Sequence, residues 1–204
     1  MTDARLRHAH DDLARLARAL ELRPGARVAL AAGERAPRRA AVALVLRVGE
    51  SGSLELLLIK RAEYEGDPWS GHMALPGGRQ EPADTTLAAT AMRETLEETA
   101  IDLMRDGEML GTLDEIYPRT PVLPPIVVRP YVFAVAPDVE LAPSDEVAAA
   151  FWVPVAGLRD PTTTVEAVVV VRGEERRVPS FTHGEHVIWG LTERILRQFI
   201  GLLG

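Results

Sequence analysis

The stretch PGGRQEPADTTLAATAMRETLEETAI, residues 76–101, carries the strongest structural signal in this chain. Its double glycine predicts a turn after a short strand, and the proline-punctuated loop that follows leads into a helix expected over residues 85–100. Asp84 is expected to cap this helix, because a carboxylate oxygen can accept the free backbone N–H groups of the first turn. The sequence therefore predicts a helix with one apolar side and one charged side.

Three glutamates gather on the charged side. Glu94, Glu97 and Glu98 stand at positions i, i+3 and i+4, so their carboxylates point to one patch of surface. Carboxylates this close repel one another unless a cation lies between them, and Mg²⁺ or Mn²⁺ is the usual ion when a substrate phosphate completes its coordination. A solvated acidic face is the alternative for the glutamates taken alone.

Two neighbours of the glutamates favour the metal interpretation. Arg93 can hold a carboxylate in a bidentate pair. Gly78 exposes a backbone carbonyl that a metal ion can approach, because no side chain is in the way. We therefore expect a divalent cation site built from the three glutamates and the carbonyl of Gly78.

This stretch resembles the Nudix box, in which a glycine and an acid precede an Arg-Glu…Glu-Glu core. Gly78, Asp84 and residues 93–98 match that order. The chain departs from the general pattern by an Asp in place of Glu, one more residue than usual before the arginine, Thr95 in place of a hydrophobic residue and Ala100 in place of the last Gly. The longer spacing, the Asp and the Pro-Gly-Gly are similar to the coenzyme A pyrophosphatase-like branch of Nudix proteins.

Two further stretches resemble that branch: LLIKR at residues 57–61, which leads to the Pro-Gly-Gly, and IWGLT at residues 188–192. The resemblance implies metal-dependent hydrolysis of the pyrophosphate bond of a nucleoside diphosphate derivative, with coenzyme A or an acyl-coenzyme A as substrate. Nucleotide sugars or dinucleotides, such as ADP-ribose and NADH, are the alternative substrates. A Nudix-fold binding module without turnover is the alternative function.

The resemblance also implies roles for residues of the box. The expected catalytic residues are Arg93, Glu94, Glu97 and Glu98. The same three glutamates and Gly78 are the expected metal-binding residues, with Mg²⁺ or Mn²⁺ as the cofactor. The general base is expected to be either Glu94 or an acid from outside the box, for which Glu146 is the first candidate and Asp145 and Glu115 are further ones. A plain surface acid is the alternative for each of these three outside acids.

Substrate binding is expected of Arg61, Trp69, His72 and Gly77. Arg61 could pair with a phosphate or form a surface salt bridge, and His72 could contact phosphate or be a hydrogen-bonded structural residue. Trp69 could stack on an adenine ring or pack beneath its loop. Arg119 and Arg129 could recognise an anionic tail or remain solvated, and Trp189 is assigned to the core.

Composition limits the classes of protein and partner. At 204 residues and 47% hydrophobic, the chain is long enough for one well-buried domain. A net charge of −7 argues against a nucleic-acid partner. The absence of cysteine excludes disulfides, thiolate zinc sites and a cysteine nucleophile. The charged N-terminus resembles no signal peptide and no apolar run has the length of a membrane span, so we expect a cytoplasmic protein with a small-molecule substrate.

The remaining periodicities predict an α/β fold. Strands are expected over residues 40–47, 54–60, 73–76, 109–116, 126–135, 146–154, 163–171 and 176–181, with a closing helix over 188–203. Pro130 implies an edge or a bulge. A Nudix-type α/β/α sandwich with a mixed sheet is therefore expected over residues 37–204. Residues 1–36 are expected to form a helical extension, which either caps the domain or makes a homodimer contact.

Overall fold

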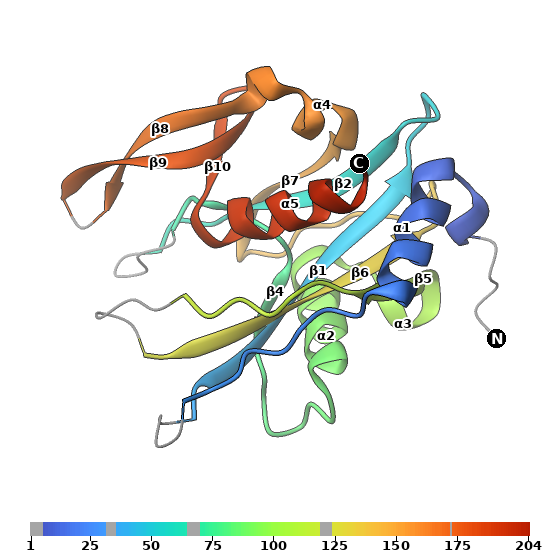
Figure 1. Ribbon diagram of the computed structural model, residues 1–204, viewed down its shortest axis with the longest axis horizontal. Coiled ribbons are helices and arrows are strands. Elements are labelled where there is room, and N and C mark those ends of the chain that lie inside the picture. The colour runs from blue at the N-terminus through green and yellow to red at the C-terminus, as the bar shows by residue number, and fades with distance from the viewer. Residues whose placement is uncertain (1–5, 32–35, 65–69, 119–123, 172) are drawn as a thin grey trace.

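The computed structural model describes residues 6–31, 36–64, 70–118, 124–171 and 173–204 (Figure 1). Its larger sheet contains β1 (Arg38–Val48), β2 (Leu54–Arg61), β3 (Met73–Ala74), β4 (Gly77–Arg79), β5 (Gly107–Thr112), β6 (Ile126–Val135) and β7 (Val147–Pro154). The strand order is β3-β2-β1-β6-β5, with β4 paired to β1 and β7 to β2. Strands β1 and β6 run parallel and the other pairs antiparallel, so the sheet is mixed.

Helices cover both faces of this sheet. On one face, α2 (Leu87–Thr99) and α3 (Leu103–Asp106) pack against the side that carries Ala41, Ala43 and Val45 of β1. On the other face, α1 (Asp11–Leu22) and α5 (Gly190–Leu202) pack against the alternate residues Leu44 and Leu46. Because successive residues of a strand point to opposite faces, the apolar run of β1 contributes to both cores. The predicted α/β/α sandwich is confirmed.

A second, three-stranded sheet follows β7. The chain passes through α4 (Val155–Arg159) and a 3₁₀ turn, η2 (Pro161–Thr163), into β8 (Thr164–Val171), β9 (Glu174–His183) and β10 (His186–Trp189). The prediction missed β10 and began the last helix too early. Gly190 has a φ of +69°, which turns the chain from strand to helix at a point where glycine carries no steric penalty.

The N-terminal helix is a cap on the domain. A short 3₁₀ turn, η1 (Leu6–His8), precedes α1, so the helix is shorter than expected. Its apolar side chains, Leu13, Leu16, Ala17 and Leu20, are buried in the same core as α5. The apolar side of α1 is therefore used within its own chain, and a homodimer through that side is not supported.

Two local predictions in the sheet concern the double glycine and Pro130. The double glycine forms strand β4 rather than a turn, because Gly77 and Gly78 pair with Val42 and Ala41 of β1. Pro130 was expected at an edge or a bulge. Strand β6 is not an edge, because it lies between β1 and β5, but its ladder with β5 shifts register between Met109 and Gly111, close to Pro130. Pro130 lies one residue beyond the end of the ladder with β5, where its missing N–H leaves no gap in that ladder.

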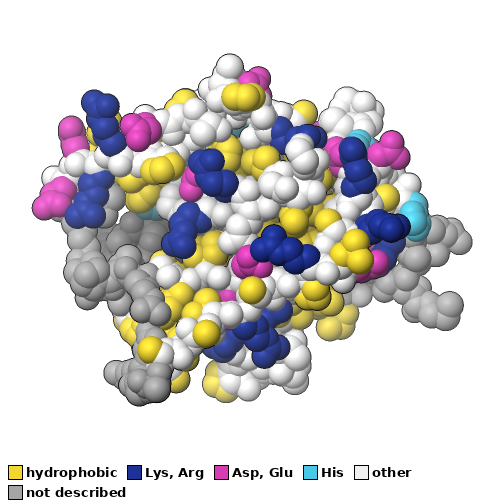
Figure 2. Space-filling model, in the orientation of Figure 1, with side chains coloured by type: hydrophobic (Ala, Val, Ile, Leu, Met, Phe, Trp, Pro, Cys, Tyr) yellow, Lys and Arg dark blue, Asp and Glu magenta, His cyan; other side chains and the backbone are white. Residues whose placement is uncertain are grey.

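No helix in the described part of the chain is both long enough and apolar enough to cross a membrane. On the described surface that carries α5, basic side chains stand among apolar and acidic ones rather than in one continuous stripe (Figure 2).

Candidate active site

Helix α2 starts and ends at defined residues. Thr86 is its N-cap, and the Thr86 side chain accepts a 3.1 Å hydrogen bond from the Ala89 N–H. The prediction that Asp84 caps the helix was therefore wrong, because the helix begins two residues later than Asp84 requires. At the other end, Ala100 adopts a left-handed conformation with a φ of +61°. This is the position at which the Nudix box pattern has glycine, and it is a conformation that disfavours any side chain.

Arg93 connects the helix to the loop that precedes it. Its Nε and Nη2 each donate to the Asp84 carboxylate at 3.1 Å, so the predicted bidentate pair is present. Further bonds reach Glu94 and Glu97 at 2.9 Å each and the Arg79 carbonyl at 3.1 Å. The Arg93 guanidinium lowers the pKa of Asp84 from 3.8 to about 2. Asp84 therefore anchors Arg93, which in turn holds two of the candidate metal-binding acids.

Glu98 is the most buried of the three glutamates. Only 4% of it is exposed, and its carboxylate accepts a 2.9 Å hydrogen bond from the Gly77 N–H. Burial, together with the carboxylates of Glu94 and Glu146, raises the pKa of Glu98 to about 7, against the opposing effects of Gly77 and Arg61. Burial among other acids therefore makes this position unfavourable for a lone carboxylate and favourable for a bound cation.

The other two glutamates differ in exposure. Burial raises the pKa of Glu94, and Arg93 opposes that shift while Glu97 and Glu146 add to it. The Glu97 side chain is 57% exposed and bonds Arg93. The three acids of the motif thus range from a buried carboxylate at the sheet to a solvent-facing one at the outer surface of α2.

The two glycines of β4 lie directly against these acids. A Cβ built on Gly78 would collide with the Glu94 carboxylate, so glycine is what allows this acid to approach the strand. A Cβ on Gly77 would collide with the β1 backbone, 2.6 Å from the Cα of Val42, and Gly77 has a φ of +151°. The close approach of β4 to β1 therefore requires glycine at position 77, whereas a Cβ at position 78 would displace the Glu94 carboxylate.

The candidate general base Glu146 belongs to the same acidic group. Its charge raises the pKa of both Glu94 and Glu98. The Glu146 carbonyl accepts a 2.9 Å bond from the Ala62 N–H, and the Ser144 N–H donates to the Glu98 carbonyl at 3.1 Å. The loop before β7 is thus fixed between the end of β2 and the end of α2, which brings Glu146 to the site.

Glu115 is placed differently, and its candidacy as a base is not supported. Its buried carboxylate is paired with Arg39 and with Arg129, the latter at 3.4 Å, and accepts a 2.9 Å bond from the Val28 N–H. Both of its oxygens are therefore engaged within the chain, Oε1 by the two guanidinium groups and Oε2 by the Val28 N–H. Asp145 has its backbone carbonyl bonded to the hydroxyl of Tyr64 at 3.1 Å.

The residues expected to bind substrate are only partly brought together. Arg61, at the end of β2, is close enough to favour the charged form of Glu98. The His72 ring packs edge-on against Trp189, with 4.8 Å between ring centroids, and Trp189 is half-buried rather than a core residue. Gly77 contacts Glu98 directly. Trp69 and Arg119 lie outside the described residues.

Sequence reasoning missed part of the cationic surface beside the site. Arg39 is two residues before Ala41 on β1, and Arg129 is two residues before Tyr131 on β6, so both lie on the face that carries α2. The guanidinium of Arg129 lies 5.9 Å from the centre of the Tyr131 ring. The sequence did contain a signal for Arg39, because it is a charged residue on the face of β1 whose other residues point into the core.

The arrangement of these acids indicates whether a divalent cation could bind among them. Among the described residues, no three His, Cys, Asp or Glu side chains converge as a ready-made metal cage. Instead, Arg93 holds Glu94 and Glu97, the Gly77 N–H holds Glu98, and of these carboxylates Glu94 lies against Gly78. The donor set is all oxygen, and the mutual repulsion of Glu94, Glu98 and Glu146 favours a cation among them. The residues present therefore suit Mg²⁺ or Mn²⁺, provided that the glutamates turn from Arg93 to the metal.

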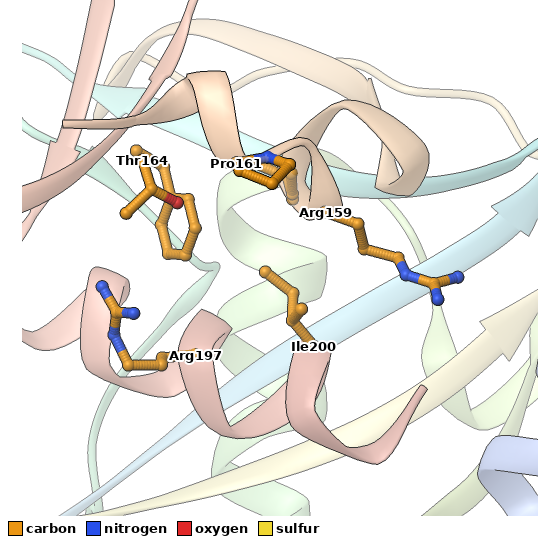
Figure 3. Close-up of a pocket in the computed structure, with 7 residues that line it drawn as sticks. Arg159, Pro161, Thr164, Arg197 and Ile200 are labelled. Atoms are coloured by element: carbon orange, nitrogen blue, oxygen red, sulfur yellow. The ribbon is translucent and has the colours of Figure 1, made fainter. Parts of the chain in front are cut away.

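A separate hollow of about 380 Å³ lies between α4 and α5 (Figure 3). It is lined by Leu158, Arg159, Pro161, Thr164, Phe181, Arg197 and Ile200. None of the predicted site residues belongs to this lining, so the hollow is distinct from the acidic site on α2.

Several known proteins are similar to this chain in sequence. A Nudix hydrolase named NudL from Enterobacter sp. (strain 638) is 31% identical over 174 residues, which cover 82% of this chain and 83% of that protein. The corresponding NudL of Photorhabdus laumondii is 32% identical over 143 residues, covering 70% and 74% of the two chains. A Schizosaccharomyces pombe protein, C14C4.10c, is 37% identical over 142 residues, but the match spans 60% of this chain and only 43% of that protein.

Solved structures share the fold. A MutT/nudix family protein from Enterococcus faecalis superposes with a TM-score of 0.55 at 19% identity, over 86% of this chain and 65% of that one. An Ap4A hydrolase from C. elegans superposes with a TM-score of 0.50 at 18% identity, over 81% and 97%. The NUDIX domain family matches residues 37–172, a range that includes β4, α2 and the acidic site. The chain therefore belongs to the Nudix hydrolase family.

Proposed function

We propose that this protein hydrolyses the pyrophosphate bond of coenzyme A or an acyl-coenzyme A, with Mg²⁺ or Mn²⁺ bound at Glu94, Glu97, Glu98 and the Gly78 carbonyl. The observation that carries the proposal is the burial of Glu98 among other acids, with its pKa raised to about 7. An acidic group of this kind repels an anionic diphosphate, so substrate binding there requires an intervening cation. When bound, the cation neutralises charge on the diphosphate and lowers the pKa of a bound water.

The protein's own residues then have separate tasks. Arg93 holds Glu94 and Glu97 on the substrate side of α2, and Asp84 orients Arg93. The Gly77 N–H fixes the Glu98 carboxylate against the sheet. Glu146 is the proposed acceptor of the proton from the attacking water, because it is the acid from outside the helix whose charge acts on both Glu94 and Glu98.

Coenzyme A is proposed as the substrate on two grounds. The Pro-Gly-Gly, the LLIKR stretch and the IWGLT stretch resemble the coenzyme A pyrophosphatase-like branch. In addition, coenzyme A carries a third phosphate on its ribose, and Arg39 and Arg129 offer cationic groups on the same face of the sheet as α2. These guanidiniums share the single carboxylate of Glu115, which leaves a net positive charge for an anion.

A product assay tests this proposal. The protein would be incubated with Mg²⁺ and with Mn²⁺ and given coenzyme A, ADP-ribose, NADH or Ap4A, and the products separated by chromatography. Release of 3′,5′-ADP and phosphopantetheine from coenzyme A is the expected result. Turnover of ADP-ribose, NADH or Ap4A alone would retain the chemistry and overturn the substrate. Binding of Mg²⁺ without any turnover would favour the alternative, a Nudix-fold binding module.

A further inference from the structure

The start of α5 is tied to the short strand that leads to the candidate metal site. Thr192, in the first turn of α5, is buried, and its hydroxyl donates a 3.2 Å hydrogen bond to the Met73 carbonyl. Trp189 is the residue just before α5, and its ring packs against the ring of His72. Two neighbouring residues of the 72–73 segment are therefore each held by the junction of β10 and α5.

Strand β3 has little backbone pairing with which to keep its position, although the Met73 side chain is buried in the core. It consists of Met73 and Ala74 and lies at the end of the strand order, so it pairs with β2 on one side only. A strand of two residues with one neighbour contributes little stability without tertiary contacts. The hydrogen bond from Thr192 and the ring contact from Trp189 add tertiary contacts to this segment beside its pairing with β2.

Only three residues separate Met73 from Gly77. Within them, Leu75 is buried, and the Pro76 carbonyl accepts a 2.8 Å bond from the Ala43 N–H. Gly77 then donates to Glu98, and Gly78 lies directly against Glu94. A shift of Met73 is transmitted through this short, tightly packed segment to the backbone groups that fix both acids.

The geometry points to Trp189 and Thr192 as positioning residues for the candidate metal site. They hold the 72–78 segment so that the Gly77 N–H and the Gly78 backbone stay in place against Glu98 and Glu94. Neither residue touches the acids, and both act through the segment. This inference rests on the proposed function for its metal, whereas the positioning itself is a property of the metal-free chain. The two can therefore fail separately.

The test uses the full chain with Thr192→Val, which keeps the shape of the side chain and removes the hydroxyl, and Thr192→Ser, which restores it. The first readout is the amide ¹H–¹⁵N resonance of Gly77 in metal-free protein. The second is the Mn²⁺ concentration at half-saturation, followed by electron paramagnetic resonance at a temperature where all variants are folded. Thr163→Val is the matched control, because it also removes a hydroxyl bound to backbone carbonyls, those of Gly157 and Asp160.

For Thr192→Val we expect a displaced Gly77 resonance and Mn²⁺ half-saturation at an about three- to tenfold higher concentration, a smaller effect than the 10–100-fold typical of direct partners of metal ligands. Thr192→Ser and Thr163→Val should stay within about twofold of wild type. Trp189→Leu should act as Thr192→Val does, and Trp189→Phe should retain most of the ring contact with His72.

An unmoved Gly77 resonance in Thr192→Val would overturn the inference. So would Mn²⁺ affinity within about twofold of wild type when wild type itself binds the ion. Absence of Mn²⁺ binding by the wild-type chain would instead overturn the proposed function. The positioning claim would then be decided by the Gly77 resonance alone.

Discussion

Removal of the Arg93 side chain should destabilise the fold through Asp84. The Asp84 side chain is only 5% exposed, and Arg93 donates two of the hydrogen bonds that it accepts. The lowering of its pKa from 3.8 to about 2 corresponds to about 2 kcal/mol of stabilisation at neutral pH. Because Arg93→Ala also leaves a buried carboxylate without its cation, we expect a total loss of about 3 kcal/mol at pH 7.

The sign of the pH dependence follows from the lowered pKa. The unfolded chain binds a proton at Asp84 more readily than the folded chain does, so this stabilisation is present above about pH 4 and is lost as the pH falls toward 2. A double-mutant cycle with Arg93→Ala and Asp84→Asn isolates the pair from other acids that titrate in the same range. The coupling energy, measured by urea unfolding with a chelator present, should be about 2 kcal/mol at pH 7 and fall toward zero near pH 2.

The matched control for this cycle is the exposed pair of Arg105 and Asp106, whose side chains are 72% and 27% exposed. Arg105→Ala should change the free energy of unfolding by less than about 0.5 kcal/mol. A coupling below about 0.5 kcal/mol between Arg93 and Asp84 at pH 7, or one that does not change between pH 7 and pH 3, would refute the assignment of Asp84 as the anchor of Arg93.

Three further changes have defined outcomes. Ala100→Gly should raise the free energy of unfolding by about 1 kcal/mol, because the left-handed φ of +61° costs alanine more than glycine. Gly77→Ala should lower the free energy of unfolding in urea by at least about 2 kcal/mol, because the added Cβ meets the β1 backbone. Gly78→Ala should cost less stability but weaken Mn²⁺ binding, because the added Cβ meets the Glu94 carboxylate. The pKa of Glu98 is about 7 in the folded chain and 4.5 in the unfolded chain, so the stability of metal-free wild type falls as the pH rises from about 4.5 to 7. Glu98→Gln lacks this titration and should therefore be more stable than metal-free wild type above pH 7 by about 1–3 kcal/mol.

Each of these changes has a contradicting result. For Ala100→Gly, the contradicting result is a loss of stability of about 1 kcal/mol, which is the loss expected for Ala89→Gly inside the same helix. Equal effects of Gly77→Ala and Gly78→Ala on both stability and Mn²⁺ affinity would contradict the assigned contacts. A Glu98→Gln variant whose stability follows the wild-type pH profile would show that Glu98 does not titrate in the predicted window.

The features that the sequence predicted are those with local causes. Strand β6 was predicted with its observed bounds, and the i, i+3, i+4 spacing brought three glutamates to one side of α2. Arg93 was expected to hold a carboxylate, but the pairing with Asp84 depends on the path of the loop, which the motif spacing does not specify. Asp84 and Thr86 are both good capping residues, and tertiary contact with Arg93 decided between them.

Features that depend on packing between distant segments were missed. Glu115 was an open candidate for a base because nothing local indicates that Arg39 and Arg129 converge on it from β1 and β6. Strand β10 has only four residues, and it is a strand because β9 pairs with it rather than because of its own pattern. The role of Gly78 was expected to be exposure of a carbonyl, and the structure adds that it makes room for Glu94.

If the acids of α2 hold the catalytic cation, loss of one of them must slow hydrolysis of the diphosphate. The decisive measurement is the initial rate of coenzyme A cleavage with Mg²⁺ for wild type, Glu97→Gln and Glu166→Gln, the last a control at an exposed glutamate on β8. We expect a loss of about 100-fold or more for Glu97→Gln and a wild-type rate for Glu166→Gln. Wild-type turnover by Glu97→Gln would contradict this role of the acids.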